Sequence, residues 1–449
     1  MKNTKAKHTN LIVGIDEKIS VKYAFFLGLQ HVFAMDLYIV PIILAGILSL
    51  NAQNTAYFIQ MSFIAAGVAT VIQTGLCMRL PIMQGPSYIP IGALAAIGSK
   101  LGLQAMVGSL IPGSLFLIIL GYPLRFLSKI ISKFIPHIVG GTVIVIVGIA
   151  LMPVAMTNIF TAPGNLKTNC ILALVSSSLL VICMMIGRKA NKFGKFVKLT
   201  SVMISLIGGT IVASLLGVVD FTTVAKADWF SFPKLLPFGK PVFDLKAILT
   251  MLFIYAVILV ETSGTWFAVS AVTGKELTDK SLNRGAVGEG IGCFVGALFG
   301  GTPMTGYSTN AGIIAVTGVG SRMAIMAGGI ILVILGMLPK LMNVIACIPS
   351  AVVSGVFAVV CVIIAMNGLK SIQHEDFDER NMLLIGLPIL LALGTTVLPK
   401  DILNSLPSLA NYIFSSGITV GALAAVILNI LLPKTATQVP KSEEYKEAV

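Results

Sequence analysis

Long stretches without a charged residue dominate the chain. Asp, Glu, Lys and Arg are absent from residues 37–78, 80–99, 101–124, 134–166, 168–187, 199–219, 290–321, 323–339, 341–369, 381–399 and 402–433. About 20 apolar residues let a helix cross the hydrocarbon core of a bilayer, so several stretches fit one crossing and a few fit two. Their apolar runs do not alternate with polar residues, which excludes barrel strands. Since backbone in hydrocarbon must satisfy its own hydrogen bonds, the pattern predicts an all-α polytopic membrane protein.

The pattern predicts about fourteen transmembrane segments, some of them short or broken. We place them near residues 21–49, 56–78, 84–98, 103–124, 134–155, 168–187, 199–219, 247–273, 285–300, 309–320, 323–339, 348–366, 381–398 and 410–432. Basic residues gather before the first segment, after the last, and in the loops 125–133, 188–198 and 275–284. These loops fall on one side, which the positive-inside rule identifies as the cytoplasm. We therefore expect a multi-pass protein of the inner cell membrane with both termini cytoplasmic.

Composition agrees with a chain that lies mostly in lipid. Hydrophobic residues make up 56%, charged residues 11%, and the mean hydropathy is +0.96, whereas soluble domains carry about 25% charged residues. The net charge of +13 follows from the positive-inside rule, so we expect no nucleic-acid partner. The six cysteines lie apart and the four histidines lack metal-ligand spacing, so no metal or cofactor is expected. No nucleophile–base set or phosphate loop is found, and an enzyme is therefore not expected.

Two of the predicted segments are interrupted. Residues 81–90 and 300–312 lie in short segments that are rich in Gly, Pro, Ser and Thr. Proline lacks the helical donor and glycine loses the most entropy, so a regular helix is disfavoured there and extended backbone is expected. Kinks that merely shape packing are the alternative. Because paired interruptions in the two halves of a transporter mark its binding site, the binding interpretation is favoured.

The two halves of the chain also resemble each other. Ile135-Pro136 and Ile348-Pro349 each open a predicted segment, and Gly85-Pro86-Ser87-Tyr88 and Gly306-Tyr307-Ser308-Thr309 each open an interrupted one. The two matches have nearly the same offset, which corresponds to seven segments. Partners seven segments apart cross the membrane in opposite directions, so the pattern predicts two inverted seven-span repeats.

Few ionisable residues lie at membrane depth: His31, Asp36, Glu261 and Glu289. A carboxylate at the bilayer centre costs about 2.5–3.5 kcal/mol, so such residues usually face a partner, a cavity or a substrate. Glu261 is the best placed, in the middle of an apolar segment, where burial favours its protonated form. Each residue also has a structural interpretation as the alternative to a functional one. Glu261 could form a structural ion pair, Glu289 could cap a helix, and His31 could be a core histidine whose hydrogen bonds are satisfied.

Several motifs resemble the nucleobase–ascorbate transporter family, also called the nucleobase cation symporter-2 or xanthine/uracil permease family. Its signature of Asn-x-Gly, four residues and Thr fits Asn310-Ala311-Gly312 followed by Thr317-Gly318. Gln30-His31, Glu261, the pair Trp229-Phe230 and residues 296–303 match in the same order along the chain. The resemblance runs from residue 20 to about residue 430.

The resemblance implies fourteen spans, short strands in spans three and ten, a homodimer and, for bacterial members, proton coupling. It implies a core domain and a gate domain, each assembled from two parts of the chain. The implied parts are an N-terminal tail (1–20), core (21–125), gate (126–245), core (246–340), gate (341–433) and a C-terminal tail (434–449).

The same resemblance implies a role for each site residue. Substrate binding is assigned to Glu261, Tyr88, Ser308, Thr309 and Asn310. Of these, Glu261 would hydrogen-bond the ring nitrogens of a base and Tyr88 would pack on its ring. A proton-coupling or supporting network is assigned to His31, Glu289, Asp36 and Thr265.

Three departures from the family pattern concern the substrate. Thr309 stands where the family has Gln, Glu or Pro, Thr265 replaces a more usual Asp or His, and the first span around Asp36 is shorter with an acid inserted. Residues 148–155 resemble the xanthine and urate branch more than the uracil branch.

We therefore predict a secondary active transporter that imports a nucleobase, a purine such as xanthine or urate, by proton symport with alternating access. The alternatives are a uracil or other pyrimidine permease, a sodium-coupled or anion transporter of the same fold, and a channel without coupled transport.

Overall fold

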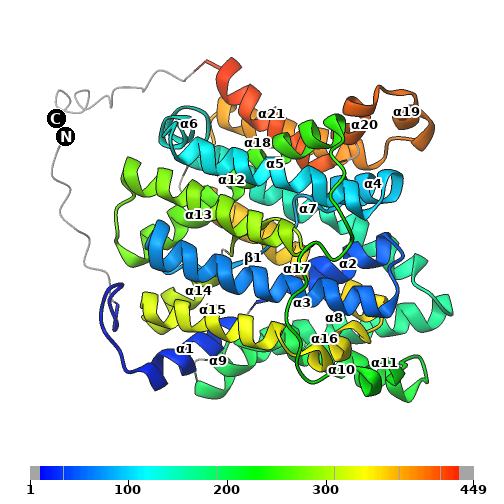
Figure 1. The fold of residues 1–449 in the computed structure, drawn as a ribbon. Helices are drawn as coiled ribbons and strands as arrows, with labels where there is room; N and C mark the ends of the chain where they lie inside the picture. The colour runs from blue at the N-terminus through cyan, green and yellow to red at the C-terminus, as the bar shows by residue number, and fades with distance from the viewer. Residues whose placement is uncertain are drawn as a thin grey trace, which may run out of the picture.

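The computed structural model describes residues 11–433 except positions 34, 190, 308, 374 and 415. Half of the predicted N-terminal tail (1–20) and all of the C-terminal tail (434–449) therefore lie outside the described residues. The described part is helical, with two short strands near its centre (Figure 1).

The first half of the chain forms eleven α-helices, one π-helical turn and one strand among the described residues. They are α1 (Val21–Phe33), α2 (Ile39–Ile47), α3 (Ala52–Val71), η1 (Ile72–Cys77), β1 (Gln84–Pro86), α4 (Ile91–Leu101), α5 (Leu103–Gly121), α6 (Leu127–Phe134), α7 (His137–Thr161), α8 (Leu166–Ile186), α9 (Lys192–Leu199), α10 (Ser201–Leu215) and α11 (Thr222–Lys226).

The second half supplies the remaining described elements. They are α12 (Leu245–Thr273), α13 (Asp279–Leu298), β2 (Met304–Gly306), α14 (Thr309–Thr317), α15 (Arg322–Gly336), α16 (Pro339–Ala346), α17 (Ser350–Ile372), α18 (Glu379–Thr396), α19 (Lys400–Ser405), α20 (Ser408–Phe414) and α21 (Gly417–Leu431).

Six of the described helices are long and apolar enough to cross a membrane alone: α3 with η1, α5, α7, α8, α12 and α17. The helices α15 and α16 add a seventh crossing if they form one span, which bends by 83° at their junction. Of the other predicted segments, α13 (20 residues) and α18 (18 residues) are long enough but less apolar, and the rest are shorter helices or pairs of helices. The chain is thus a helical, multi-pass membrane protein, while the count of fourteen spans stays a prediction.

The first predicted segment is broken in the structure. Residues 21–49 hold α1 and α2 on either side of a break that contains Asp36. The interrupted segments predicted at residues 81–90 and 300–312 contain β1 and β2, each followed by a short helix, α4 or α14. These two strands confirm the predicted extended backbone.

The helices pack in two groups. We call α1–α5 and α12–α15 with both strands the strand-bearing bundle, and α7, α8, α10, α17, α18 and α21 the second bundle. Glycines allow close approach within each bundle. A Cβ at Gly28 of α1 would lie 2.5 Å from the backbone nitrogen of Gly328 in α15, and one at Gly148 of α7 would lie 2.4 Å from that of Ala365 in α17. Small residues at such contacts are typical of helix packing in membranes.

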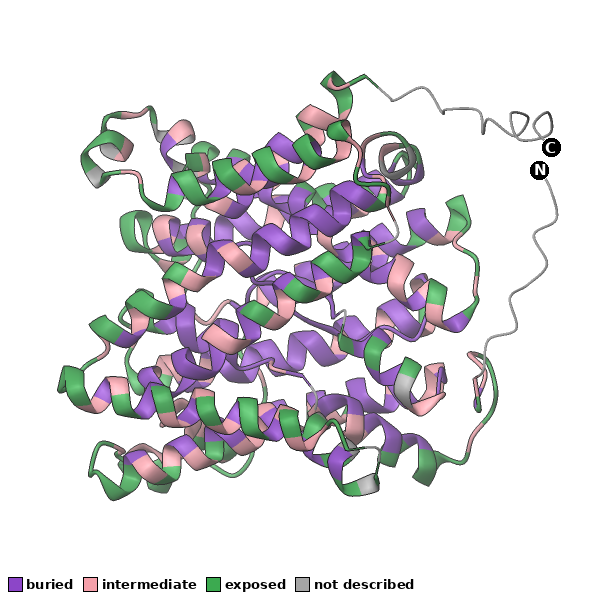
Figure 2. Cartoon of the chain, turned by 180° about the vertical axis from the view of Figure 1, so that it is seen from behind, coloured by how far each residue is buried: buried purple, intermediate pink, exposed green. Residues whose placement is uncertain are grey.

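Apolar side chains also cover much of the outside of the molecule. Leu174 of α8, Leu390 of α18 and Ile430 of α21 are exposed, and Figure 2 shows buried residues gathered towards the middle of the helix assembly. An exposed apolar surface of this extent suits contact with lipid tails, because hydrocarbon solvates such side chains as well as a protein core does.

A connection without regular structure joins the two bundles after α11. It crosses the strand-bearing bundle (Figure 1) and is tied to it by backbone hydrogen bonds. The nitrogens of Ser231, Leu236 and Val242 donate to the carbonyl oxygens of Met337, Leu298 and Gln104, at 3.1, 2.9 and 3.1 Å. The connection therefore belongs structurally to the bundle that it enters.

Candidate functional site

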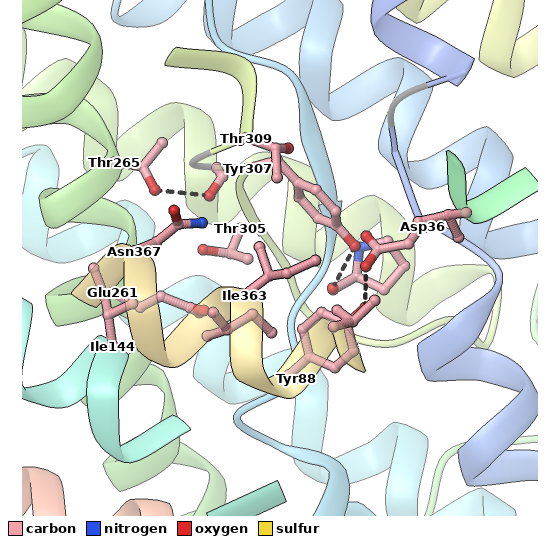
Figure 3. A pocket seen from close by; sticks show the side chains of 15 residues that line it. Asp36, Tyr88, Ile144, Glu261, Thr265, Thr305, Tyr307, Thr309, Ile363 and Asn367 are labelled. Atoms are coloured by element: carbon pink, nitrogen blue, oxygen red, sulfur yellow. Dashed lines mark hydrogen bonds between the residues drawn. The ribbon is translucent and has the colours of Figure 1, made fainter. Parts of the chain in front are cut away.

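A pocket lies between the two bundles, beside the paired strands (Figure 3). The strand-bearing bundle contributes Asp36, Pro86, Tyr88, Glu261, Thr265, Thr305, Gly306, Tyr307 and Thr309 to its lining. The second bundle contributes Ile144, Val202, Val360, Ile363, Ile364 and Asn367. One wall is thus largely polar and the opposite wall largely aliphatic, an arrangement that suits a flat ligand with polar edges.

The polar wall is built on the pairing of β1 with β2. The strands run antiparallel, with Gln84 opposite Gly306 and Pro86 opposite Met304. Two further hydrogen bonds extend the pairing, from the nitrogen of Ser87 to the Pro303 oxygen (2.9 Å) and from that of Tyr307 to the Met83 oxygen (3.0 Å). Backbone groups at membrane depth are thereby satisfied, as they must be.

The strands approach each other closely because Gly85 has no side chain. A Cβ at this position would lie 2.4 Å from Cε2 of Tyr307 and 2.6 Å from Cδ2 of Leu37. The Tyr307 hydroxyl donates to the Pro86 oxygen at 3.2 Å. The tyrosine ring is thus held against the partner strand.

Glu261 lies in the middle of α12 and is half-buried in the pocket wall. The Ser87 hydroxyl donates to its Oε2 at 3.0 Å. On the same helix, Thr265 donates to the Gly306 oxygen at 2.9 Å, and Thr262 accepts from the Gly306 nitrogen at 3.2 Å. These bonds fix α12 against both strand segments, so the carboxyl group faces the pocket from a rigid support.

Asp36 is a second acid in the pocket lining. Its Oδ2 accepts a hydrogen bond of 2.6 Å from the Tyr88 hydroxyl. The Tyr88 ring is stacked on Phe357 of α17, with ring centroids 5.5 Å apart and planes inclined by 16°. The aromatic ring predicted to pack on a base therefore also contacts the second bundle.

Two of the predicted residues hold the scaffold instead of lining the pocket. His31 Nδ1 and Asn310 Oδ1 lie 2.6 Å apart, and Asn310 Nδ2 donates to the Pro81 oxygen at 3.0 Å. Both side chains are buried. They join α1 and α14 to the segment before β1.

Glu289 of α13 is also buried and outside the pocket lining. Its Oε2 accepts from Gln73 Nε2 at 3.2 Å, and the same amide nitrogen lies 3.0 Å from the Gly285 oxygen, which also accepts from it. Glu289 Oε1 has no hydrogen-bond partner among the described residues. Of the remaining predicted residues, Thr309 lines the pocket, whereas Ser308 lies outside the described residues.

Sequence reasoning did not single out Ser87, Thr305, Tyr307 or Asn367. The first three belong to the interrupted segments, so their position was available as a signal even though their individual roles were not. Thr305 Oγ1 is buried beside the pocket and has no hydrogen-bond partner among the described residues. Asn367 is an isolated amide in an otherwise apolar stretch of α17.

The comparisons with known proteins agree on one family. A sequence model described as the permease family, of xanthine/uracil type, matches residues 22–401. Nucleobase transporter PlUacP of Paenibacillus larvae is 35% identical over 415 residues, which cover 90% of this chain and 93% of that protein. Uric acid permease PucK of Bacillus subtilis is 32% identical over 431 residues, covering 94% and 97%. A xanthine permease of Bacillus subtilis is 32% identical over 417 residues, covering 90% and 92%.

A solved structure shows the same fold at low sequence identity. The transmembrane domain of the cyanobacterial bicarbonate transporter BicA matches with a TM-score of 0.60 at 17% identity, covering 94% of this chain and 100% of that chain. The likeness identifies a helical membrane-transporter fold. Together with the family match and the full-length relatives, it shows that the chain is a transporter, not an enzyme, and that it belongs to the xanthine/uracil permease family, also known as the nucleobase–ascorbate transporters.

Proposed function

We propose that the protein imports a nucleobase, a purine such as xanthine or urate, by proton symport with alternating access. The observation that carries the proposal is the position of Glu261. Its carboxyl group lines a pocket between two helix bundles and is oriented by Ser87, next to the strand pair. The relatives named as uric acid and xanthine permeases support a purine as the cargo.

The pocket walls match the two kinds of surface that a base has. Its polar edge would meet Glu261, the unpartnered Thr305 hydroxyl and Thr309 on the strand-bearing bundle. Its apolar faces would meet aliphatic side chains of the second bundle such as Ile144 and Ile363. A polar group left unpaired in a dry site costs about 1–3 kcal/mol, which is enough to discriminate between bases.

Proton coupling would use the Glu261 carboxyl group. In the outward-facing state it takes up a proton and binds the base, and the second bundle then moves relative to the strand-bearing bundle. On the cytoplasmic side the base and the proton leave. Sodium is the alternative coupling ion. Asp36 is the acid in the pocket whose presence suggests this alternative.

The proposed architecture is the fourteen-span, inverted-repeat one. Core parts 21–125 and 246–340 and gate parts 126–245 and 341–433 would form the two moving bodies of each subunit of a homodimer. Antiparallel pairing of one strand from each half supports this arrangement. The placement in the inner cell membrane with cytoplasmic termini is supported by the basic loops on one side.

Uptake by Glu261→Gln tests the coupling role. In vesicles with an imposed pH gradient, the wild type should accumulate labelled xanthine above equilibrium, whereas Glu261→Gln should not, because an amide cannot carry the proton. Glu276→Gln, at an exposed position after α12, is the control and should accumulate xanthine normally. Full pH-driven accumulation by Glu261→Gln would remove this carboxyl group from coupling. Accumulation driven by sodium at constant pH would favour the sodium alternative.

The fold shared with BicA makes an anion transporter the second candidate. Two carboxyl groups in the pocket count against it, because they repel a small anion such as bicarbonate, which lacks the N–H donors that a purine offers to them. Competition by unlabelled purines, uracil and bicarbonate against xanthine uptake separates the candidates. Purines should compete, and bicarbonate should not.

A further inference from the structure

The pocket contains two acids where the family motifs account for one. Asp36 and Glu261 lie towards opposite ends of the pocket, with Thr305, Tyr307 and Ile363 between them (Figure 3). Asp36 comes from the break between α1 and α2, and Glu261 from the middle of α12. A ligand that fills the space between them therefore has an acceptor at each end.

Asp36 is held in place by an aromatic scaffold. The Tyr88 hydroxyl donates to Oδ2, and the Tyr88 ring, only 6% exposed, is stacked on Phe357. Tyr307, the other tyrosine of the pocket, is fixed through its hydroxyl to the Pro86 oxygen. A carboxylate has about four lone-pair sites on two oxygens, so one bond from Tyr88 leaves further acceptor capacity on a residue that lines the pocket.

Among the described residues, no basic side chain forms an ion pair with Asp36. None of the pocket-lining residues is Lys, Arg or His, and the ion pair found among the described residues joins Arg322 to Asp16, not Asp36. An acid buried at membrane depth without an ion-pair partner carries a cost that a ligand donor can offset.

We propose that Asp36 is a specificity-determining residue that accepts a hydrogen bond from an N–H group on the edge of the base remote from Glu261. The inference rests on the proposed function, and it narrows the substrate to a two-ring base with N–H donors on both rings. A single-ring base would satisfy one acid and leave the other unpaired. A hydrogen bond to a charged group corresponds to a difference in affinity of about tenfold or more.

The test uses xanthine and its 1-, 3-, 7- and 9-methyl derivatives. A methyl group at N1 or N3 replaces one N–H of the six-membered ring, and a methyl group at N7 or N9 replaces the single N–H of the five-membered ring. Inhibition of labelled xanthine uptake is measured in vesicles for the full chain, Asp36→Asn, Tyr88→Phe and Asp401→Asn. Asp401 is exposed in the first turn of α19, so its variant controls for the loss of an acid. Size-exclusion profiles in detergent report whether each variant is folded.

In the wild type, removal of the contacted N–H of either ring by methylation should weaken inhibition by about tenfold or more. Asp36→Asn should reduce this loss of inhibition for the N–H of one ring and leave it unchanged for the N–H of the other. Tyr88→Phe should do the same to a smaller extent, and it tests the inference even if Asp36→Asn does not fold. Asp401→Asn should keep the wild-type profile.

If Asp36→Asn weakened inhibition by xanthine and by all four methyl derivatives to the same extent, Asp36 would have a general structural role and the inference would be overturned. An unchanged methyl profile with lost pH-driven accumulation would assign Asp36 to coupling and overturn it as well. In both cases the wild type still transports xanthine, so the proposed function stands. A wild type that takes up no xanthine overturns the proposed function together with the inference.

Discussion

The Ser87 hydroxyl and the Glu261 carboxyl group show how a single hydrogen bond orients the site. They are 3.0 Å apart and come from the segment after β1 and from α12. A hydroxyl group that donates to a carboxyl oxygen fixes the orientation of that carboxyl group. Because Glu261 is only half-buried, its carboxyl group would turn more freely without this donor.

Ser87→Ala should raise the KM for xanthine uptake by up to about tenfold, as expected for the loss of one hydrogen bond in the site. Ser109→Ala is the matched control, because Ser109 is equally buried but donates to the Met106 oxygen of its own helix. Uptake measured in vesicles at a series of xanthine concentrations gives the KM of each variant. An unchanged KM in Ser87→Ala would show that Glu261 is oriented by other groups.

At the scale of elements, the sequence predicts the breaks that have a local chemical cause. Proline and glycine clusters at residues 81–90 and 300–312 correctly predict extended backbone. The break between α1 and α2 has no such signal, because residues 34–38 contain neither proline nor glycine. Asp36, an acid within an apolar segment, is the sequence feature that coincides with this break. The strand register could not be predicted either, because it depends on contacts between segments far apart in the chain.

Gly85→Ala should abolish uptake, because its Cβ would overlap the Tyr307 ring and force β1 away from β2. Gly386→Ala in α18 should retain uptake, since no atom lies within 4 Å of the added Cβ. Uptake normalised to the amount of folded protein distinguishes a damaged site from poor expression. Normal uptake in Gly85→Ala would mean that the close strand contact is dispensable.

At the scale of the whole molecule, the pocket lies between two bundles, and the sequence indicates the pocket face of only one of them. Polar residues identify the wall from the strand-bearing bundle, and Glu261, Tyr88 and Thr309 on this wall were predicted as site residues. The opposite wall comes from helices that are apolar on every side, so periodicity does not distinguish their pocket face from their lipid face. Ile144 and Ile363 could therefore not be predicted, whereas the isolated amide of Asn367 was a signal that the sequence offered.

A cross-link between the bundles should stop transport if they move relative to each other. A Cβ at Gly264 of α12 would lie 3.1 Å from Cδ1 of Ile144 in α7. In a chain whose native cysteines are replaced and whose uptake is retained, Ile144→Cys with Gly264→Cys should lose uptake on treatment with mercuric ions and regain it with excess thiol.

The control pair lies within the strand-bearing bundle. Gly75→Cys with Met326→Cys should keep uptake after the same treatment, since a Cβ at Gly75 would lie 3.0 Å from Sδ of Met326. The single variant Gly264→Cys should be insensitive, and the single variant Ile144→Cys, which lies in the pocket lining, measures how much mercury on one wall alone reduces uptake. Persistent uptake by the efficiently cross-linked pair between the bundles would contradict relative motion of the two bodies.

The pairing of β1 with β2 also constrains how the protein is made. Pro86 and Tyr307, whose contact helps to close the strand pair, are 221 residues apart. A nascent chain must therefore extend through about two thirds of its length before the second strand can meet the first. Until then, the first strand's peptide groups lack the ladder that satisfies them in hydrocarbon. The pocket therefore forms late in synthesis and membrane insertion. A chain that is terminated before residue 304 lacks the second strand and cannot form it.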